Sequence, residues 1–283
     1  MINAVIVSNI TLNAEKYNAQ IDEFLVKSTL IPNFNLTHVL ATDILNYISE
    51  NKVDLCLFWD KDIYLAGAIK AMGVRVFNNI AAIYRADDKA LTALKLQEHN
   101  VEQPPFFVFP ETFGANVFAY YEMYKKDLLA LRFPLVIKHR YGSFGEQVFQ
   151  AKNEEELKEI IEREGKNKLI AQSYITKEFG VDYRVNVVGD EVVAVIKRHN
   201  KDDFRSNINR GGKFFSVEKE ELHQIAIAAT KALSAHFAGV DIVLDQNDKP
   251  YVIEVNSNMR TVTINEKSAT DVTLAILKYI AKK

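Results

Sequence analysis

The chain has 283 residues, 48% of them hydrophobic and 25% charged, with a formal net charge of −2 at pH 7. These values are typical of a globular protein with more than one packed unit. They exclude a general attraction to nucleic acid or to anionic membranes, so any anion site is expected to be local. The single cysteine, Cys56, excludes an internal disulfide, and its apolar setting VDLCLF predicts a buried thiol in a reducing compartment.

Short β-branched runs alternate with helical patterns in the N-terminal part of the chain. Strands are predicted over AVIVSN, VDLCLFW and VRVFN, and helices over AEKYNAQIDEFLVK, TDILNYISEN and DIYLAGAIKAMG. This alternation predicts a parallel sheet with right-handed crossovers. The N-terminus has no signal-peptide pattern, and no apolar run approaches the roughly 20 residues that span a bilayer. We therefore expect a cytoplasmic protein with no membrane partner.

The pattern changes after Pro104 and Pro105, which predict a domain junction. Beyond them, FPLVIKHRYGSFGEQVFQA predicts two strands joined by a glycine-containing turn, and DYRVNVVGDEVVAVIKRH predicts a hairpin that turns at Gly189-Asp190. The fold class expected is therefore α/β at the N-terminus and α+β behind it. We expect three domains, over residues 1–86, 87–174 and 175–283.

A second hairpin, GVDIVLDQNDKPYVIEVN, carries candidate metal ligands. If the ladder is symmetric about the turn 246–249, Asp241 lies opposite Glu254, and Asn256 shares the face of Glu254 because it is two residues further along the strand. Two opposed carboxylates repel each other unless a cation lies between them. Oxygen ligands favour Mg²⁺ or Mn²⁺ over zinc. The alternative, an acidic face turned to solvent, is disfavoured by the apolar neighbours of these residues on both strands.

Lys138 ends an apolar strand just before the turn GSFG, over residues 142–145. Its ammonium group and the N–H groups of a flexible turn could bind phosphate oxygens, although a lysine at this position could also simply extend to solvent. Asp182 and Arg184 share a strand face. They could form an ion pair, or they could hold a ribose hydroxyl and an anionic group.

The stretch DFRSNINRGG, residues 203–212, joins two core segments but has almost no apolar side chains. Arg205 and Arg210 can each present a planar fork to carboxylate or phosphate oxygens, and Gly211-Gly212 allows the backbone to approach a ligand closely. A solvated surface turn is the alternative. Together with the hairpin and the lysine–glycine turn, this loop supplies the parts needed to handle a nucleoside triphosphate.

The segments FPLVIKHRYGSFG, GVDYRVNVVGDEVVAVIKR, DFRSNINRGG, AGVDIVLD and VIEVNSN resemble, in order and spacing, the ATP-grasp superfamily. They are most similar to its RimK-like carboxylate–amine ligases, which add α-linked glutamate to a protein C-terminus. The resemblance covers about residues 75–283. It implies an ATP-grasp fold with an N-terminal α/β domain, a central lid domain and a C-terminal antiparallel-sheet domain.

The resemblance also implies a role for each matching position. Lys89 and Lys138, together with the turn residues Gly142 and Ser143, would contact ATP phosphates. A hinge formed by Gln172, Ser173, Tyr174 and Ile175 would hold adenine, with Asp182 near the ribose. Asp241, Glu254 and Asn256 would bind magnesium, with two ions expected. Arg205, Ser206 and Asn207 would bind the nucleotide and the intermediate; Arg205, Arg210 and Asn207 are the expected catalytic residues.

The activity implied is ligation of a carboxylate substrate to an amino acid amine, with glutamate as the leading candidate, through an acyl phosphate. A ligase for a small molecule rather than a protein C-terminus is a rival within this class, and a non-catalytic, regulatory ATP-binding module is a rival outside it. A nucleic-acid partner is not expected, because the basic residues form no aromatic-interleaved stripe. We expect a homo-oligomer, a dimer or a tetramer.

Three positions depart from the family pattern. Ser173 stands where relatives usually have glutamate, and Glu146-Gln147 follows GSFG where relatives often have glycine. After EVNSN the chain continues MRTVTIN instead of a loop with Pro-Gly. The last departure lies on the acceptor side and bears on substrate identity.

Overall fold

The computed structural model describes residues 1–9, 15–142, 145–206, 212–266, 268 and 270–283. The N-terminal part is a four-stranded sheet in the order β2-β1-β3-β4, and its pairs are all parallel, as expected. Its strands are β1 (Ile2–Ser8), β2 (Phe34–Leu40), β3 (Leu55–Trp59) and β4 (Arg75–Phe77), and its helices α1 (Glu15–Ser28), α2 (Ile44–Glu50) and α3 (Ile63–Ala71). Strand β2 was not predicted, because FNLTHVL mixes polar and apolar residues without a continuous apolar run.

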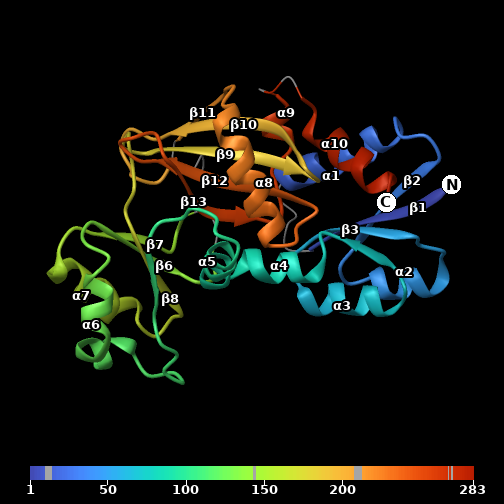
Figure 1. Cartoon of the computed structure of the whole chain (residues 1–283). Coiled ribbons are helices and arrows are strands. Elements are labelled where there is room, and N and C mark those ends of the chain that lie inside the picture. The colour runs from blue at the N-terminus through green and yellow to red at the C-terminus, as the bar shows by residue number, and fades with distance from the viewer. Residues whose placement is uncertain (10–14, 143–144, 207–211, 267, 269) are drawn as a thin grey trace.

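A central sheet, antiparallel throughout, follows in the order β5-β8-β6-β7. It consists of β5 (Phe106–Val108), β6 (Leu135–His139), β7 (Val148–Ala151) and β8 (Leu169–Ser173). A 3-10 turn (Val117–Tyr120) and the helices α6 (Tyr121–Leu129) and α7 (Glu154–Glu164) cover one face and share a core with it. In Figure 1 this green unit lies at one end of the molecule.

A five-stranded antiparallel sheet in the order β11-β10-β9-β12-β13 forms the C-terminal part. Its strands are β9 (Val181–Val188), β10 (Glu191–His199), β11 (Lys213–Ser216), β12 (Phe237–Leu244) and β13 (Pro250–Asn256). On one face, alternating valines and isoleucines pack on α8 (His223–Ala232), which follows a 3-10 turn (Glu220–Leu222). Alternation then directs the polar residues of the same strands to the opposite face.

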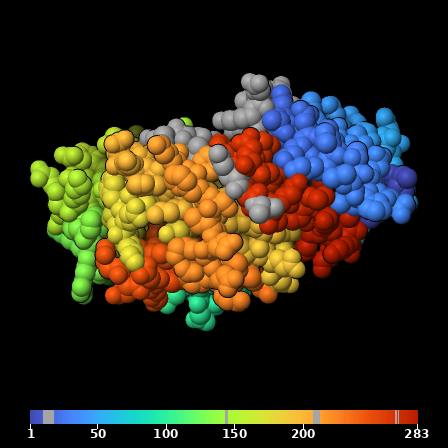
Figure 2. All heavy atoms as spheres, turned by 90° about the horizontal axis from the view of Figure 1, so that it is seen from above, coloured from blue at the N-terminus to red at the C-terminus, as the bar shows by residue number. Residues whose placement is uncertain are grey.

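The remaining helices join these units. Helices α4 (Ile80–Asp87) and α5 (Lys89–Glu98) run between the sheets, and α5 contacts both α8 and β13. After α9 (Val262–Asn265), the last helix, α10 (Val272–Ala281), packs on α1, so that the chain ends against its own N-terminal part. Figure 2 shows the red C-terminal segment beside the blue N-terminal one. The three sheets fall within the three predicted domain ranges, whose boundaries stay predictions.

The β9–β10 and β12–β13 hairpins of the C-terminal sheet each contain a β-bulge. Asp241 lies opposite Glu254, as expected, but Ile242 lies opposite Val252, so Ile253 is an extra residue. In the other hairpin Val192 lies opposite Val187 and Ala194 opposite Asn186, so Val193 is extra. Because a shift of one residue turns a side chain to the other face of a sheet, both bulges decide which residues face the cleft described below.

Among the described residues, no helix is long and apolar enough to cross a membrane. Cys56 is fully buried in β3, as expected, and burial raises the pKa of its thiol.

Candidate active site

A cleft lies between the central and C-terminal sheets. It brings together most of the residues predicted for the site, although they come from five separate stretches of the chain. Lining it are Lys89, Lys138, Gly142, Gln172, Ser173, Tyr174, Ile175, Asp182, Arg205, Ser206, Asp241 and Glu254. Asn256 lies two residues along β13 from Glu254, whereas Ser143, Asn207 and Arg210 lie outside the described residues.

Asp241 is a buried carboxylate held by two arginines. Arg184 donates from Nε to its Oδ1 and from Nη2 to its Oδ2, the latter at 2.6 Å, and Arg198 Nη2 lies 3.0 Å from Oδ1. Burial alone would raise the pKa of this carboxyl, but the two guanidinium groups lower it. A carboxylate has about four lone pairs. Three contacts with the arginines therefore leave Asp241 able to make about one bond to a cation in the cleft.

Asp182 and Arg184 do not pair with each other. Asp182 instead accepts two hydrogen bonds of 2.6 Å from Arg198, whose pKa is raised by the two neighbouring carboxylates despite burial. Arg198 was not singled out from the sequence. A hairpin without a bulge would place Asp182 opposite Lys197, whereas the bulge at Val193 places it opposite Arg198.

Glu254 is the more accessible of the two carboxylates. Its side chain is 29% exposed, and its Oε1 lies 3.3 Å from Lys89 Nζ. Asn256 donates from its amide nitrogen to Gly239 O at 3.4 Å, which leaves its oxygen as the atom that can face a cation. Among the described residues, no three His, Cys, Asp or Glu side chains gather as a metal site. The predicted ligands are two carboxylates and an amide oxygen, a donor set that fits Mg²⁺ or Mn²⁺.

Lys138 is buried on the opposite wall of the cleft and donates to Gln172 Oε1 at 2.6 Å. Its pKa is lowered to about 8, chiefly because burial disfavours the ammonium form. Glu254 and Asp241 oppose this shift, and Lys89 adds to it. Lys138 does not extend to solvent, so that alternative is wrong.

The predicted hinge has its own backbone partners. Ser173 N donates to Pro105 O and Tyr174 N to Pro134 O, both at 2.9 Å, and Ser173 Oγ donates to Leu131 O at 2.8 Å. The serine found in place of the usual glutamate therefore ties the hinge to the central domain. Its departure from the family pattern leaves the hinge backbone in place.

Arg205 reaches across the cleft to the central sheet. Its Nη1 donates to Gly145 O at 2.9 Å and to Val148 O at 3.0 Å, while Nε and Nη2 donate to Asp203. A guanidinium has five N–H groups, and these contacts occupy most of them. Arg205 thus links its own loop to the turn that follows Lys138.

Gly142 and Gln147 lie next to each other in that turn. The Gly142 carbonyl accepts a hydrogen bond from Lys89 Nζ at 2.9 Å, and a Cβ at this glycine would meet Gln147 Oε1 at 2.6 Å. Gln147, one of the departures from the family pattern, itself lines the cleft.

The comparisons with known proteins agree with this geometry. A model described as the RimK-like ATP-grasp domain matches residues 86–280. A probable alpha-L-glutamate ligase of Legionella pneumophila is 32% identical over 223 residues, which cover 76% of this chain and 70% of that protein. An uncharacterized protein of Mycoplasma pneumoniae is 32% identical over 238 residues, 81% of each chain.

Two solved structures share the fold. D-alanine–D-alanine ligase from Bacillus anthracis complexed with ATP has a TM-score of 0.74 at 17% identity, covering 100% of this chain and 98% of that one. A RimK domain ATP-grasp protein from Sphaerobacter thermophilus has a TM-score of 0.70 at 15% identity, covering 98% of each chain.

The parallel sheet followed by two antiparallel sheets that enclose a cleft is the ATP-grasp fold. The chain belongs to the RimK-like ATP-grasp family, as its sequence motifs predicted. This membership implies an ATP-dependent ligase that forms an amide bond between a carboxylate and an amine.

Proposed function

We propose that this protein is a Mg²⁺- or Mn²⁺-dependent ligase that joins a carboxylate substrate to the amine of an amino acid, with glutamate as the first candidate. The observation that carries the proposal is the cleft itself, in which Lys89 and Lys138 face Asp241 and Glu254. Transfer of a phosphoryl group requires cationic groups and oxygen ligands for a metal ion close together. The name of the Legionella relative supports glutamate.

In this proposal different residues of the cleft bind the metal ion, the phosphates and adenine. Asp241, Glu254 and Asn256 would hold the metal ion, which supplies charge stabilisation to the phosphates when bound. Lys89 and Lys138 would bind phosphate oxygens. The carbonyl groups of the hinge and Ile175 would contact adenine, because the N–H groups of Ser173 and Tyr174 already donate within the protein.

The substrate carboxylate would then attack the γ-phosphate of ATP, forming an acyl phosphate and releasing ADP. The amine of the second substrate would displace phosphate by attack on the acyl carbon, losing a proton as the amide bond forms. Water competes with the amine for the same intermediate, so closure of the cleft matters for yield.

The test is a panel of candidate carboxylates, including acidic C-terminal peptides and small acids, each supplied with ATP and Mg²⁺ with and without glutamate or other amino acids. Phosphate release that requires both partners, with a conjugate of the matching mass, supports the ligase. Tight ATP binding without turnover for any pair would favour a regulatory nucleotide-binding module instead.

Replacement of Arg205 tests whether the link across the cleft excludes water. In Arg205→Ala we expect ATP binding to be largely intact and amide formation to fall about 100-fold, the effect of losing one important transition-state contact. The variant also loses the contacts with Gly145 and Val148 that join the two sides of the cleft. Water can then hydrolyse the acyl phosphate, so phosphate release should fall less than amide formation. Both products are counted in the same reaction. A parallel fall of both would assign Arg205 only to stabilising the negatively charged oxygen that forms when the amine attacks the acyl carbon. Near-normal turnover would contradict both this role and the exclusion of water.

Three further expectations stay predictions: a dimeric or tetrameric assembly, a cytoplasmic location and a second metal ion. A single measurement of mass in solution checks the first.

A further inference from the structure

Asp88 is a buried carboxylate at the junction of α4 and α5, directly before Lys89. Its side chain is 1% exposed. It caps α5 by accepting from Ala90 N at 2.9 Å and Leu91 N at 3.3 Å, and it also accepts from Arg140 and from the Tyr141 hydroxyl, the latter at 3.0 Å. A helix cap needs only the first two of these contacts. The other two come from the residues that directly follow β6.

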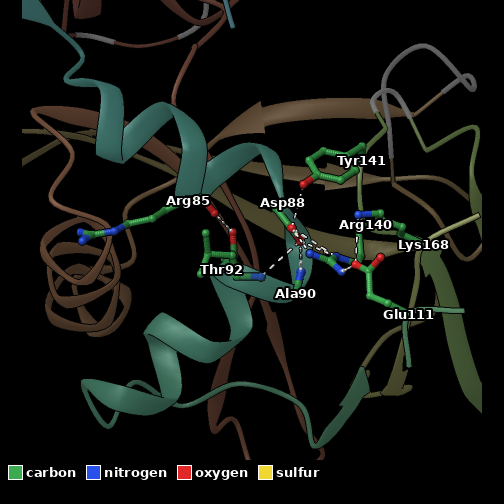
Figure 3. Close-up of polar contacts among 9 residues, drawn as sticks. Arg85, Asp88, Ala90, Thr92, Glu111, Arg140, Tyr141 and Lys168 are labelled. Carbon is green, nitrogen blue, oxygen red and sulfur yellow. Dashed lines mark hydrogen bonds and ion pairs between the residues drawn. The ribbon is translucent and has the colours of Figure 1, made fainter. Parts of the chain in front are cut away.

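The guanidinium group of Arg140 contacts the carboxylate of Asp88 through two of its nitrogens. Its Nε lies 3.0 and 3.1 Å from the two oxygens of Asp88, and its Nη2 donates to one of them as well. Burial alone would raise the pKa of the Asp88 carboxyl, but the contacts with Arg140, the Leu91 N–H and Tyr141 together lower it, which favours the charged form. On its outer side Arg140 donates from Nη1 to Glu111 at 2.7 Å, and Lys168 also lies 3.0 Å from Glu111 (Figure 3). The tightest part of this network lies on the inner side, at Asp88.

Lys89 is fixed at both ends by the segment that contains Arg140. Its backbone N–H donates to Arg140 O at 3.0 Å, and its Nζ donates to Gly142 O at 2.9 Å. The same segment begins with Lys138, the other ammonium group of the cleft. The Asp88–Arg140 pair therefore joins the two chain segments that present the two lysines, segments that lie far apart in sequence.

We propose that Asp88 and Arg140 are positioning residues for nucleotide binding, which hold Lys89 against the strand of Lys138 so that both ammonium groups meet the same phosphate group. This inference rests on the nucleotide site of the proposed function and adds residues that touch no substrate. A purely structural role is the competing explanation, because removal of a buried charge partner destabilises a fold whatever its function.

A double-mutant cycle separates the two explanations. ADP binding is measured by calorimetry in the wild type, Asp88→Asn, Lys89→Met and the double variant, with the melting temperature of each. If Asp88 acts through Lys89, Asp88→Asn weakens binding about 10-fold in the wild type and less than about twofold in the Lys89→Met protein, since residues that act through one contact are not additive. Equal losses in both backgrounds would overturn the positioning role.

Two more variants serve as controls. Arg140→Lys keeps the charge but loses the fork, so it should weaken ADP binding as Asp88→Asn does, and it serves if Asp88→Asn does not fold. Glu111→Gln removes only the outer partner of Arg140 and should leave ADP affinity unchanged; a loss equal to that of Asp88→Asn would also overturn the proposal. Because the readout is nucleotide binding, failure of amide formation in the wild type would count against the ligase and not against this pair.

Discussion

Asp241→Asn is expected to lower the free energy of unfolding by about 3 kcal/mol, whereas Glu254→Gln lowers it by less than about 1 kcal/mol, although both abolish phosphoryl transfer. The two carboxylates lie opposite each other on neighbouring strands, but their surroundings differ. Asp241 is buried with Arg184 and Arg198, and an asparagine would leave two guanidinium groups without this charged partner. Glu254 is partly exposed, and its one partner among the ion pairs of the described residues is Lys89.

Urea unfolding without nucleotide measures the first difference, and phosphate release from ATP measures the second. Each variant is the control for the other, because both replace a carboxylate by an amide of the same shape at positions that lie opposite each other. Equal free energies of unfolding for the two variants would show that Arg184 and Arg198 do not need the negative charge of Asp241 for stability. Persistent phosphate release in Glu254→Gln would contradict its assignment as a metal ligand.

Affinity for ATP is expected to fall about 10-fold between pH 7 and pH 9 because Lys138 loses its proton in this range. Its pKa is about 8 in the free protein, owing first to burial. One pH unit above this value only about one molecule in ten keeps the charged lysine that the phosphates need. Calorimetric titrations with ATP and Mg²⁺ at several pH values test this. Lys138→Met should bind ATP weakly at pH 7, and its affinity should not fall further up to pH 9. A wild-type affinity that is equally independent of pH would contradict the assignment of Lys138 to the phosphates.

The same lysine predicts the direction in which stability changes with pH. The folded pKa of about 8 lies below the ordinary lysine value of 10.5, so above pH 8 the unfolded chain binds more protons than the folded one. Stability should therefore rise with pH between about 8 and 10 relative to Lys138→Met, and not fall. Melting temperatures of both proteins across this range provide the check. A relative fall for the wild type would show that burial does not penalise the charge.

The sequence predicted the elements of the site better than its contacts. Asp241 was placed opposite Glu254 by assuming a turn centred between Asn247 and Asp248. The inner pairs of the hairpin instead centre on Asn247, and the extra residue Ile253 restores the predicted pairing further out. The prediction is confirmed, although one of its assumptions was wrong. A bulge has no strong signal among neighbouring β-branched residues, so residue counting cannot detect it.

The ion pairs of the cleft were missed for the same reason. Arg198 follows Lys197, and only the bulge at Val193 determines which of the two faces Asp182. The Asp88–Arg140 pair joins residues far apart in the chain, and its two elements meet only in the folded protein. Local patterns predict which strands and helices form, whereas contacts between distant segments depend on tertiary packing.

The two bulges also affect how relatives of this protein can be recognised. A hairpin with the same turn but without the extra residue at Ile253 would bring the same aspartate and glutamate together with one residue fewer between them. The spacing between such ligands is therefore free to change by one residue wherever a bulge is gained or lost in the strand. Pattern searches that fix this interval would overlook functional members of the family. Searches that allow one insertion on either side of each turn would retain them.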